Sequence, residues 1–242
     1  MRTLEICSHV FRYTSLMAYQ ISSLFTWPPQ CKVLYTICAT ETDDSRTIPW
    51  FNEFAVSSRR PRNVTMRLWP MEHDRLMRRS IGRNEVCLAT GADVLLLVDT
   101  DKLFGEGALD YIAENFPTDA EIVFPHFELK CSHGVGDSLI QAAIGPRVYG
   151  IDPSLFTIQA RQSTAIGGCQ IVSGDLARKA GYSQNSPRHM RPSSRWLRTK
   201  CDKTARKGWI VLHGARLRRL EIPRWYRIRH SKVGRNDIGC EN

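Results

Sequence analysis

The chain has 242 residues, 42% of them hydrophobic and 9% aromatic, which excludes an intrinsically disordered protein and allows a full hydrophobic core. Its eight scattered cysteines show neither the Cys-x-x-Cys spacing of zinc sites nor the density of a secreted disulfide scaffold. The sequence has no apolar stretch of membrane-spanning length and no apolar signal-peptide core, so we expect a soluble, cytoplasmic protein.

Strands and helices alternate along the first half of the chain. Apolar runs predict strands at 4–7, 31–39, 64–68, 94–98 and 121–124, and helical spacing predicts helices at 11–25, 72–89 and 106–115. The first helix should end before Pro28 and Pro29. This order predicts an α/β fold with a mainly parallel sheet that is flanked by helices.

Asp99-Thr100-Asp101 directly follows the apolar run at 94–98. Two carboxylates at the end of a buried strand can hold one hard divalent cation, Mn²⁺ or Mg²⁺, which keeps positions open for diphosphate oxygens. A loop with two solvated acids is the simpler alternative. Asp43 and Asp44 follow another strand, and ligands of parallel sheets bind where strands end, so these acids are expected at the same edge.

Positive charge is concentrated near the C-terminus. Residues 188–235 include sixteen lysines and arginines but only two acids, Asp202 and Glu221, whereas the net charge of the whole chain is +10. Such a segment attracts nucleic acid, an anionic membrane surface or a phosphorylated substrate, and a solvated face is the alternative. We therefore expect a core at 1–187 and a basic segment at 188–242 that folds back over the ligand site.

Four stretches resemble the GT-A nucleotide-sugar glycosyltransferases, in particular family-2-like members of the bacterial and phage type. They are Gly82-Arg83-Asn84 together with the strand that ends in Asp99-Thr100-Asp101, then the stretches 133–137, 165–172 and 227–235. The resemblance implies a GT-A (Rossmann-like) fold, Mn²⁺ or Mg²⁺, and a nucleotide-sugar donor, with a UDP-sugar expected. It also implies transfer of a hexosyl or pentosyl group to an acceptor hydroxyl with inversion, in the host cytoplasm if the chain is phage-encoded.

The resemblance also implies roles for individual residues. Asp99, Asp101 and His230 would hold the metal. The residues that would bind the donor are Asp43, Asp44, Arg83, Asn84, Thr100, Arg229, Lys232 and Arg235. The residues that would bind the sugar and the acceptor are Gly167, Gly168 and Gln170. Structural alternatives remain for each type: a turn-forming aspartate, a helical salt bridge, a surface histidine or an ordinary strand amide.

The catalytic base is the least defined part of this hypothesis. Many inverting relatives carry an acidic pair before the helix that precedes the last strand, whereas the matching region here, 193–203, offers only Asp202. Its cationic neighbours make Asp202 a weaker base, and Asp137 is the second candidate. For either residue, a surface ion pair is the structural alternative.

The charge suits a polyanionic acceptor. The resemblance to phage-type members implies a hydroxylated base in DNA as one candidate acceptor, and a glycan is the other. The rival hypothesis is a non-catalytic nucleic-acid-binding protein on a degenerate transferase fold. Arg224-Trp225-Tyr226-Arg227 interleaves cations and aromatic rings in a pattern that suits base stacking, or else anchors the C-terminus to the core. The sequence has no Walker A loop and no Gly-x-Gly-x-x-Gly, which disfavours ATPases and dinucleotide enzymes.

Overall fold

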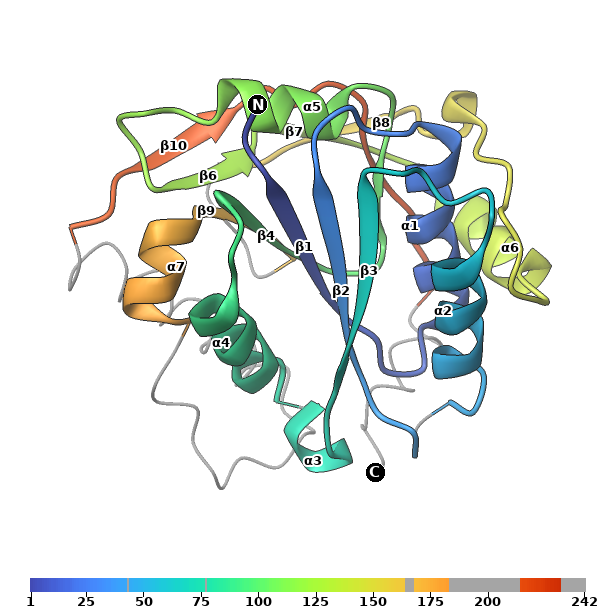
Figure 1. Ribbon diagram of the computed structural model, residues 1–242. Helices are drawn as coiled ribbons and strands as arrows, with labels where there is room; N and C mark the ends of the chain where they lie inside the picture. The colour runs from blue at the N-terminus through green and yellow to red at the C-terminus, as the bar shows by residue number, and fades with distance from the viewer. Residues whose placement is uncertain (43, 77, 164–167, 183–213, 232–242) are drawn as a thin grey trace.

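The computed structural model describes residues 1–242 except 43, 77, 164–167, 183–213 and 232–242. Its central sheet has the strand order β10-β6-β9-β4-β1-β2-β3 (Figure 1). β9 runs antiparallel to both of its neighbours, and the other pairings are parallel. The strands are β1 Leu4–His9, β2 Val33–Ala39, β3 Val64–Pro70, β4 Val94–Val98, β6 Ile122–Pro125, β9 Cys169–Ser173 and β10 Leu217–Leu220.

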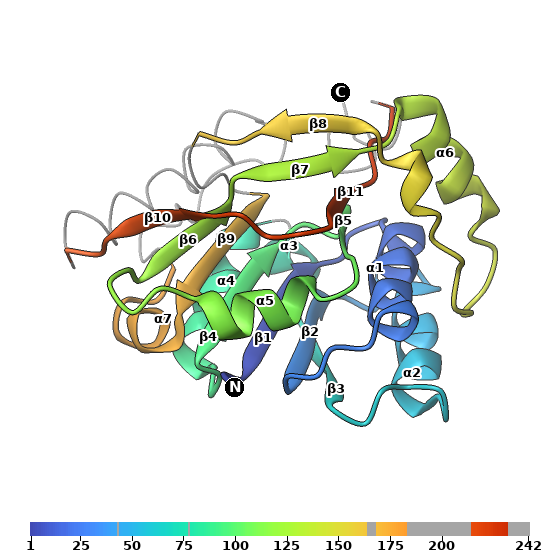
Figure 2. The same ribbon diagram turned by 90° about the horizontal axis from the view of Figure 1, so that it is seen from above.

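Helices cover both faces of this sheet (Figures 1 and 2). One layer holds α1 Thr14–Thr26, α2 Thr47–Val56, α5 Ala108–Asn115 and α6 His133–Ala142, and the other holds α3 His73–Leu76, α4 Arg79–Ala89 and α7 Gly174–Ala180. β4 is buried on both sides, because Leu96 packs into the core under α1 while Leu95 and Leu97 pack into the core under α4. A fully apolar strand is what a sheet between two helical layers requires. None of the described helices is long and apolar enough to cross a membrane.

A second, smaller sheet closes one side of the molecule (Figure 2). It contains β5 Lys102–Phe104, β11 Trp225–Arg227, β7 Phe127–Lys130 and β8 Ile158–Arg161, in that order; a 3-10 turn, η1 Pro153–Leu155, precedes β8. β11 pairs antiparallel with β5, which places Arg227 opposite Lys102. The chain near the C-terminus thus lies directly against the segment that follows Asp101.

The described part of the basic segment belongs to both sheets. β10 adds a parallel strand beside β6, and β11 joins the smaller sheet. The rings of Trp225 and Tyr226 are buried there, against Phe104 and Phe156 respectively. These two rings therefore anchor the C-terminal chain to the core, as in the second of the two alternatives for this motif.

The predicted strands and helices of the first half are confirmed, with four differences. The short strand β5, directly after Asp101, was not expected. The helix expected at 11–25 begins at Thr14, after Arg12 adopts a left-handed conformation with φ 53°. The helix expected at 72–89 is two helices, because Arg78 leaves helical geometry and α4 starts anew at Arg79. α2 was not expected; its Pro49 lies in the first helical turn, where proline is tolerated.

Candidate functional site

Asp99 lies at the carboxyl end of β4, where both its backbone and its side chain are held. Its amide donates to the carbonyl of Gly168 (3.0 Å), and Gln20 of α1 donates to its carbonyl (3.1 Å). Its Oδ1 accepts hydrogen bonds from Arg79 (2.6 Å) and Arg83 (3.3 Å), which both come from α4. The break between α3 and α4 places Arg79 in the first turn of α4, beside this carboxylate.

These cations keep Asp99 ionised. Burial alone would raise its pKa, but the charges of Arg79 and Arg83 outweigh this effect and lower it. Arg83 is fully buried and also donates to the hydroxyl of Tyr182 (3.1 Å). The Asp99 side chain remains 37% exposed, so it can still be reached by a ligand.

Asp101 is more deeply buried, with 7% of its surface exposed. Its Oδ2 accepts a hydrogen bond of 2.7 Å from Nε of Arg227. Its Oδ1 has no hydrogen-bond partner among the described residues, and Nζ of Lys102 lies 3.7 Å away. A buried carboxylate oxygen without a hydrogen bond costs free energy unless a cation meets it, and a hard divalent cation suits an oxygen of this kind.

Behind Asp101 lies a buried ion-pair network that is centred on Glu128 of β7. Glu128 contacts Nζ of Lys102 (2.7 Å), Nζ of Lys130 (2.9 Å) and a guanidinium nitrogen of Arg227 (3.4 Å). Burial would raise the pKa of Glu128, but Lys102 and Arg227 lower it to about 2. Asp101 in turn raises the pKa of Arg227. The network thus fixes Arg227, and Arg227 fixes Asp101.

Asp101, Arg227, Arg229 and His230 line one pocket of about 350 Å³, to which β7, β8 and the start of α6 also contribute. His230 contacts the ring of Tyr13, with 5.6 Å between the ring centroids. Tyr13 immediately precedes α1, so the loop after β1 and the C-terminal segment meet here. The structure therefore brings together two of the three predicted metal ligands in one pocket, and places the third, Asp99, two residues from Asp101.

α6 holds the C-terminal segment in position. Oδ1 of Asp137 accepts a hydrogen bond from the amide of Ser231 (2.8 Å). A Cβ at Gly136 would overlap the carbonyl oxygen of Arg229, so the helix approaches the chain as closely as glycine permits. Asp137 therefore lies next to His230 in space, although the two residues are far apart in the sequence.

The other described candidates are distributed around this edge. Asp44 accepts hydrogen bonds from Thr14 (2.7 Å) and from Arg46; burial would raise its pKa, but these bonds lower it to about 2. Asn84 accepts a hydrogen bond from the amide of Tyr182 (2.9 Å). Thr100 is buried, in the turn between Asp99 and Asp101.

Gln170 lies on β9, opposite Leu97 of β4. It is 1% exposed, and neither its amide nitrogen nor its amide oxygen has a hydrogen-bond partner among the described residues. Gly168, two residues earlier, accepts the hydrogen bond of Asp99. Asp43, Gly167, Asp202, Lys232 and Arg235 lie outside the residues that the structure describes.

Several residues of the site were not predicted. Glu128, Lys102, Arg79 and Gln20 come from four different elements, and each is an ordinary polar residue in its own segment. Only Lys102, which directly follows Asp101, lies near a recognisable motif. Their participation depends on the pairing of β11 with β5 and β7 and on the packing of α1 and α4, neither of which leaves a local sequence pattern.

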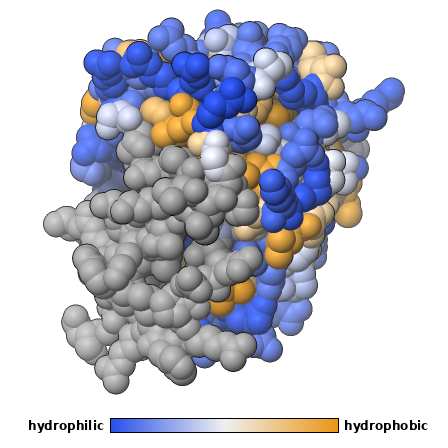
Figure 3. All heavy atoms as spheres, turned by 90° about the vertical axis from the view of Figure 1, so that its left-hand side faces the viewer, coloured by the Kyte–Doolittle hydropathy of each residue, from blue (hydrophilic) through white to orange (hydrophobic). Residues whose placement is uncertain are grey.

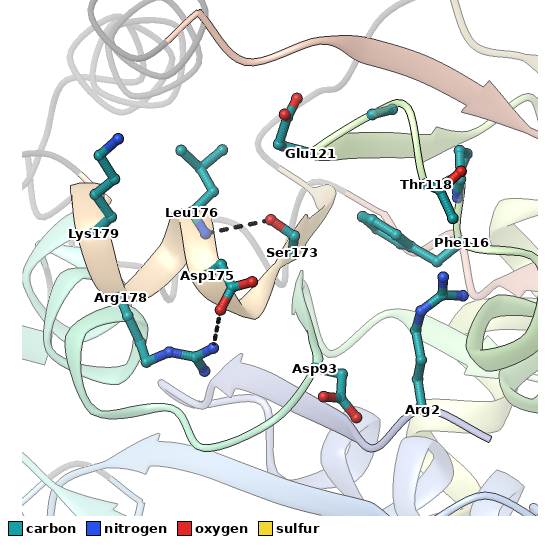
Figure 4. A pocket seen from close by; sticks show the side chains of 12 residues that line it. Arg2, Asp93, Phe116, Thr118, Glu121, Ser173, Asp175, Leu176, Arg178 and Lys179 are labelled. Atoms are coloured by element: carbon teal, nitrogen blue, oxygen red, sulfur yellow. Dashed lines mark hydrogen bonds and ion pairs between the residues drawn. The ribbon is translucent and has the colours of Figure 1, made fainter.

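A second pocket, of about 500 Å³, lies at the opposite end of the central strands, next to Arg2 and Asp93 (Figure 4). Its acids are already engaged: Asp175 pairs with Arg178 (2.6 Å), and Asp93 accepts a hydrogen bond from the hydroxyl of Thr3 (2.8 Å). Ser173 caps α7 through the amide of Leu176 (3.3 Å). The carboxyl edge, where Oδ1 of Asp101 has no hydrogen-bond partner among the described residues, is therefore the stronger candidate site.

Solved structures with the same fold are glycosyltransferases of the GT-A type. A mannosyltransferase from Pyrobaculum calidifontis, in complex with GDP-Man and Mn²⁺, matches with a TM-score of 0.55 at 11% identity over 94% of this chain and 57% of its own. TarS of S. aureus, in complex with UDP-GlcNAc, matches with a TM-score of 0.57 at 12% identity. This match covers 95% of this chain and 59% of the TarS chain. GalNAc-T7, with UDP, GalNAc and Mn²⁺, matches with a TM-score of 0.54 at 12% identity. This match covers 96% of this chain and 44% of the GalNAc-T7 chain.

These similarities establish the GT-A fold. The chain spans about three-fifths of the length of the first two proteins and less than half of the third. No protein-family model and no curated protein sequence matches the chain.

Proposed function

We propose that this chain is a metal-dependent glycosyltransferase that moves a sugar from a nucleotide-sugar to an acceptor hydroxyl. The observation that carries the proposal is the pocket at the carboxyl edge of a GT-A fold. Asp101, whose Oδ1 has no hydrogen-bond partner among the described residues, lines this pocket together with His230. The similar structures named above contain GDP-Man, UDP-GlcNAc or UDP, two of them together with Mn²⁺, which supports a donor of this class.

Asp99, Asp101 and His230 would hold Mn²⁺ or Mg²⁺. When bound, such an ion supplies a Lewis acid that stabilises the charge on the leaving nucleoside diphosphate. The residues fit this role because carboxylate oxygens and an imidazole nitrogen are available at one edge, and Asp101 keeps one oxygen free of hydrogen bonds.

The surrounding charges favour an anionic ligand. Three acids, Asp99, Asp101 and Glu128, face five cations; these are Arg79, Arg83, Lys102, Lys130 and Arg227. Arg227 and Arg229 line the pocket itself, where their guanidinium groups would bind phosphate oxygens. A fixed excess of positive charge stabilises the developing charge of a diphosphate leaving group.

A carboxylate must accept the acceptor proton if the reaction inverts the anomeric carbon. Asp137 is the described candidate, because its hydrogen bond to Ser231 places it beside the pocket that contains His230. Asp202 is the other candidate and lies outside the described residues. Asp44 and Asn84, on either side of the edge, are proposed to bind the donor, and the unpaired amide of Gln170 is proposed to bind a sugar hydroxyl.

The acceptor is proposed from the charge of the chain and from its resemblance to phage-type transferases. The basic segment at 188–235 suits a polyanion, so a hydroxylated base in DNA is the acceptor we favour over a glycan. The rival hypothesis of a non-catalytic nucleic-acid-binding protein loses its aromatic argument, since Trp225 and Tyr226 are buried and offer no free ring face for stacking on bases.

Calorimetric titration with UDP and GDP, each with and without Mn²⁺, tests the proposed function. We expect one nucleotide to bind only with Mn²⁺, and Asp101→Asn to weaken this binding by about tenfold or more, since a metal ligand is lost. Asp119→Asn is the matched control, because Asp119 pairs with Arg218 on the exposed surface. Equal affinity in Asp101→Asn and wild type, or no nucleotide binding at all, would refute the proposal.

A further inference from the structure

Three potential metal ligands lie together beneath α4. Cys7 and His9 are two residues apart on β1, so their side chains point to the same face of the sheet. Cys38 of β2 pairs with His9 in the parallel register. The two sulfur atoms and a ring nitrogen of His9 all lie within 4.8 Å of one another. The sequence shows no ligand spacing here, because the cluster forms across two strands.

The ring nitrogens of His9 are available to a metal ion. Both ring nitrogens are buried, and neither has a hydrogen-bond partner among the described residues. A buried imidazole without partners is unfavourable in a folded protein. A metal ion bound to one ring nitrogen would give that nitrogen the partner that the described residues do not supply.

The two cysteines are free and fully buried. The hydrogen bond with Cys7 and burial raise the pKa of Cys38. Arg83 acts in the opposite direction on Cys38, since its positive charge favours the thiolate. Thiolates formed on metal binding would therefore have a compensating cation next to them.

Met71 provides a fourth soft donor. A Cβ at Gly82 of α4 would lie 2.5 Å from Nε2 of His9 and 2.7 Å from Sδ of Met71. The imidazole nitrogen and the thioether therefore both pack against the same glycine, which brings them close to each other. Thiolate, thioether and imidazole together form a donor set that selects Cu(I) over hard cations.

We propose that Cys7, His9, Cys38 and Met71 bind one Cu(I) ion, at a site separate from the carboxyl-edge pocket. Each thiol loses its proton as its bond to copper forms, so two protons are released per ion and copper remains Cu(I). The bound ion would give one buried ring nitrogen of His9 a partner. It would also link β1, β2 and the segment after β3. This proposal is independent of the proposed transferase activity.

Competition for Cu(I) with bathocuproine disulfonate, under anaerobic reducing conditions, tests the site. We expect wild type to take one equivalent of Cu(I), and Cys38→Ser to lose about tenfold or more in affinity. Met71→Leu keeps the core volume and should weaken binding without unfolding the protein. Cys31→Ser is the control, since Cys31 is also buried but does not belong to the cluster; its backbone amide donates a hydrogen bond to Asp110.

The outcomes separate the alternatives. Binding that is weakened in Cys38→Ser and Met71→Leu but not in Cys31→Ser supports the site. Equal Cu(I) binding in wild type and Cys38→Ser would overturn it, as would stoichiometric Zn(II) binding that Cu(I) cannot displace. Thermal melts of each variant in the absence of metal distinguish lost ligands from lost folding.

Discussion

Asp101 and Glu128 are both buried carboxylates beside Arg227, yet their oxygens are paired differently. Both oxygens of Glu128 are engaged, by Lys102 on one side and by Lys130 and Arg227 on the other. Asp101 shares one oxygen with Arg227 and keeps the other without a hydrogen bond. Glu128 therefore has a structural role that orients Arg227, whereas Asp101 retains capacity to bind a ligand.

Replacing Glu128 by glutamine should destabilise the protein. The change removes the shorter of the two ion pairs of buried Lys102 and leaves only its 3.7 Å contact with Asp101. Breaking a buried ion pair costs about 3–5 kcal/mol. Chemical denaturation at pH 7 measures this loss as a lower free energy of unfolding. Glu106→Gln, at an exposed surface pair with Arg224, should change the free energy by less than about 1 kcal/mol.

The same carboxylate predicts an acid limit of stability. The folded state lowers the pKa of Glu128 from 4.5 to about 2, so its stabilisation is complete above pH 4.5 and is lost as the pH falls toward 2. Glu128→Gln should therefore show a flatter decline of unfolding free energy between pH 4.5 and 2 than wild type. Parallel curves for the two proteins would contradict the assigned network.

For the individual residues of the site, the sequence predicted the acids but not their partners. Asp99 and Asp101 could be identified because an apolar strand ends directly before them, and the ends of parallel strands form binding edges. Glu128 and Lys102 become buried only through the pairing of β5, β7 and β11, which joins segments about a hundred residues apart. Long-range pairing of this kind leaves no periodic signal in the chain.

Among the elements, α6 has the clearest influence on the site. Its N-terminal turn is capped by Ser132, whose hydroxyl accepts from the amide of Val135 (3.2 Å). The same turn presents Gly136 to the carbonyl of Arg229 and Asp137 to the amide of Ser231. α6 thus positions the segment that carries His230.

Gly136→Ala should weaken both folding and ligand binding. The added methyl group would overlap the carbonyl of Arg229, and such overpacking costs about 1–3 kcal/mol. Gly134→Ala is the matched control in the same helix turn, because a Cβ there meets open space. We expect Gly134→Ala to keep wild-type stability or to gain about 0.5–1 kcal/mol.

Thermal melts and Mn²⁺-dependent nucleotide titrations of both variants check this prediction. A Gly136→Ala protein that melts and binds like Gly134→Ala would show that α6 does not fix the C-terminal segment.

The helices also show where sequence periodicity is insufficient. The pattern over 72–89 is continuous in its apolar spacing, yet the chain breaks at Arg78 so that α4 begins at the sheet edge. α2 escaped prediction because Pro49 usually ends a helix, and only its place in the first turn makes it compatible. Tertiary packing decides both cases.

In the folded molecule, the basic segment is less separated from acidic residues than it is along the sequence. Four arginines of the basic segment pair with acids of the core: Arg216 with Glu121, Arg218 with Asp119, Arg224 with Glu106, and Arg227 with Asp101. The mildly acidic core and the basic segment therefore neutralise each other in part. The side that carries α4 and α7 shows a mainly hydrophilic described surface with small apolar areas (Figure 3).

If DNA is the acceptor, duplex DNA should bind in the absence of any donor, and its affinity should fall steeply with salt. Six phosphate contacts would reduce the affinity about a thousandfold between 50 and 200 mM salt. Fluorescence anisotropy with a labelled duplex over this range measures the slope. A flat dependence, or binding that requires the donor, would exclude the basic segment as a DNA-binding surface.

Thermal stabilisation by a panel of nucleotide-sugars, each with and without Mn²⁺, shows whether the chain binds a donor through a metal ion. A ligand that binds only the folded state adds about 2.7 kcal/mol of stability at a hundredfold excess over its Kd. We predict a rise in melting temperature for one donor, present only with Mn²⁺ and absent in Asp101→Asn. No rise for any donor, with a rise for DNA instead, would contradict the transferase proposal and favour the nucleic-acid-binding alternative.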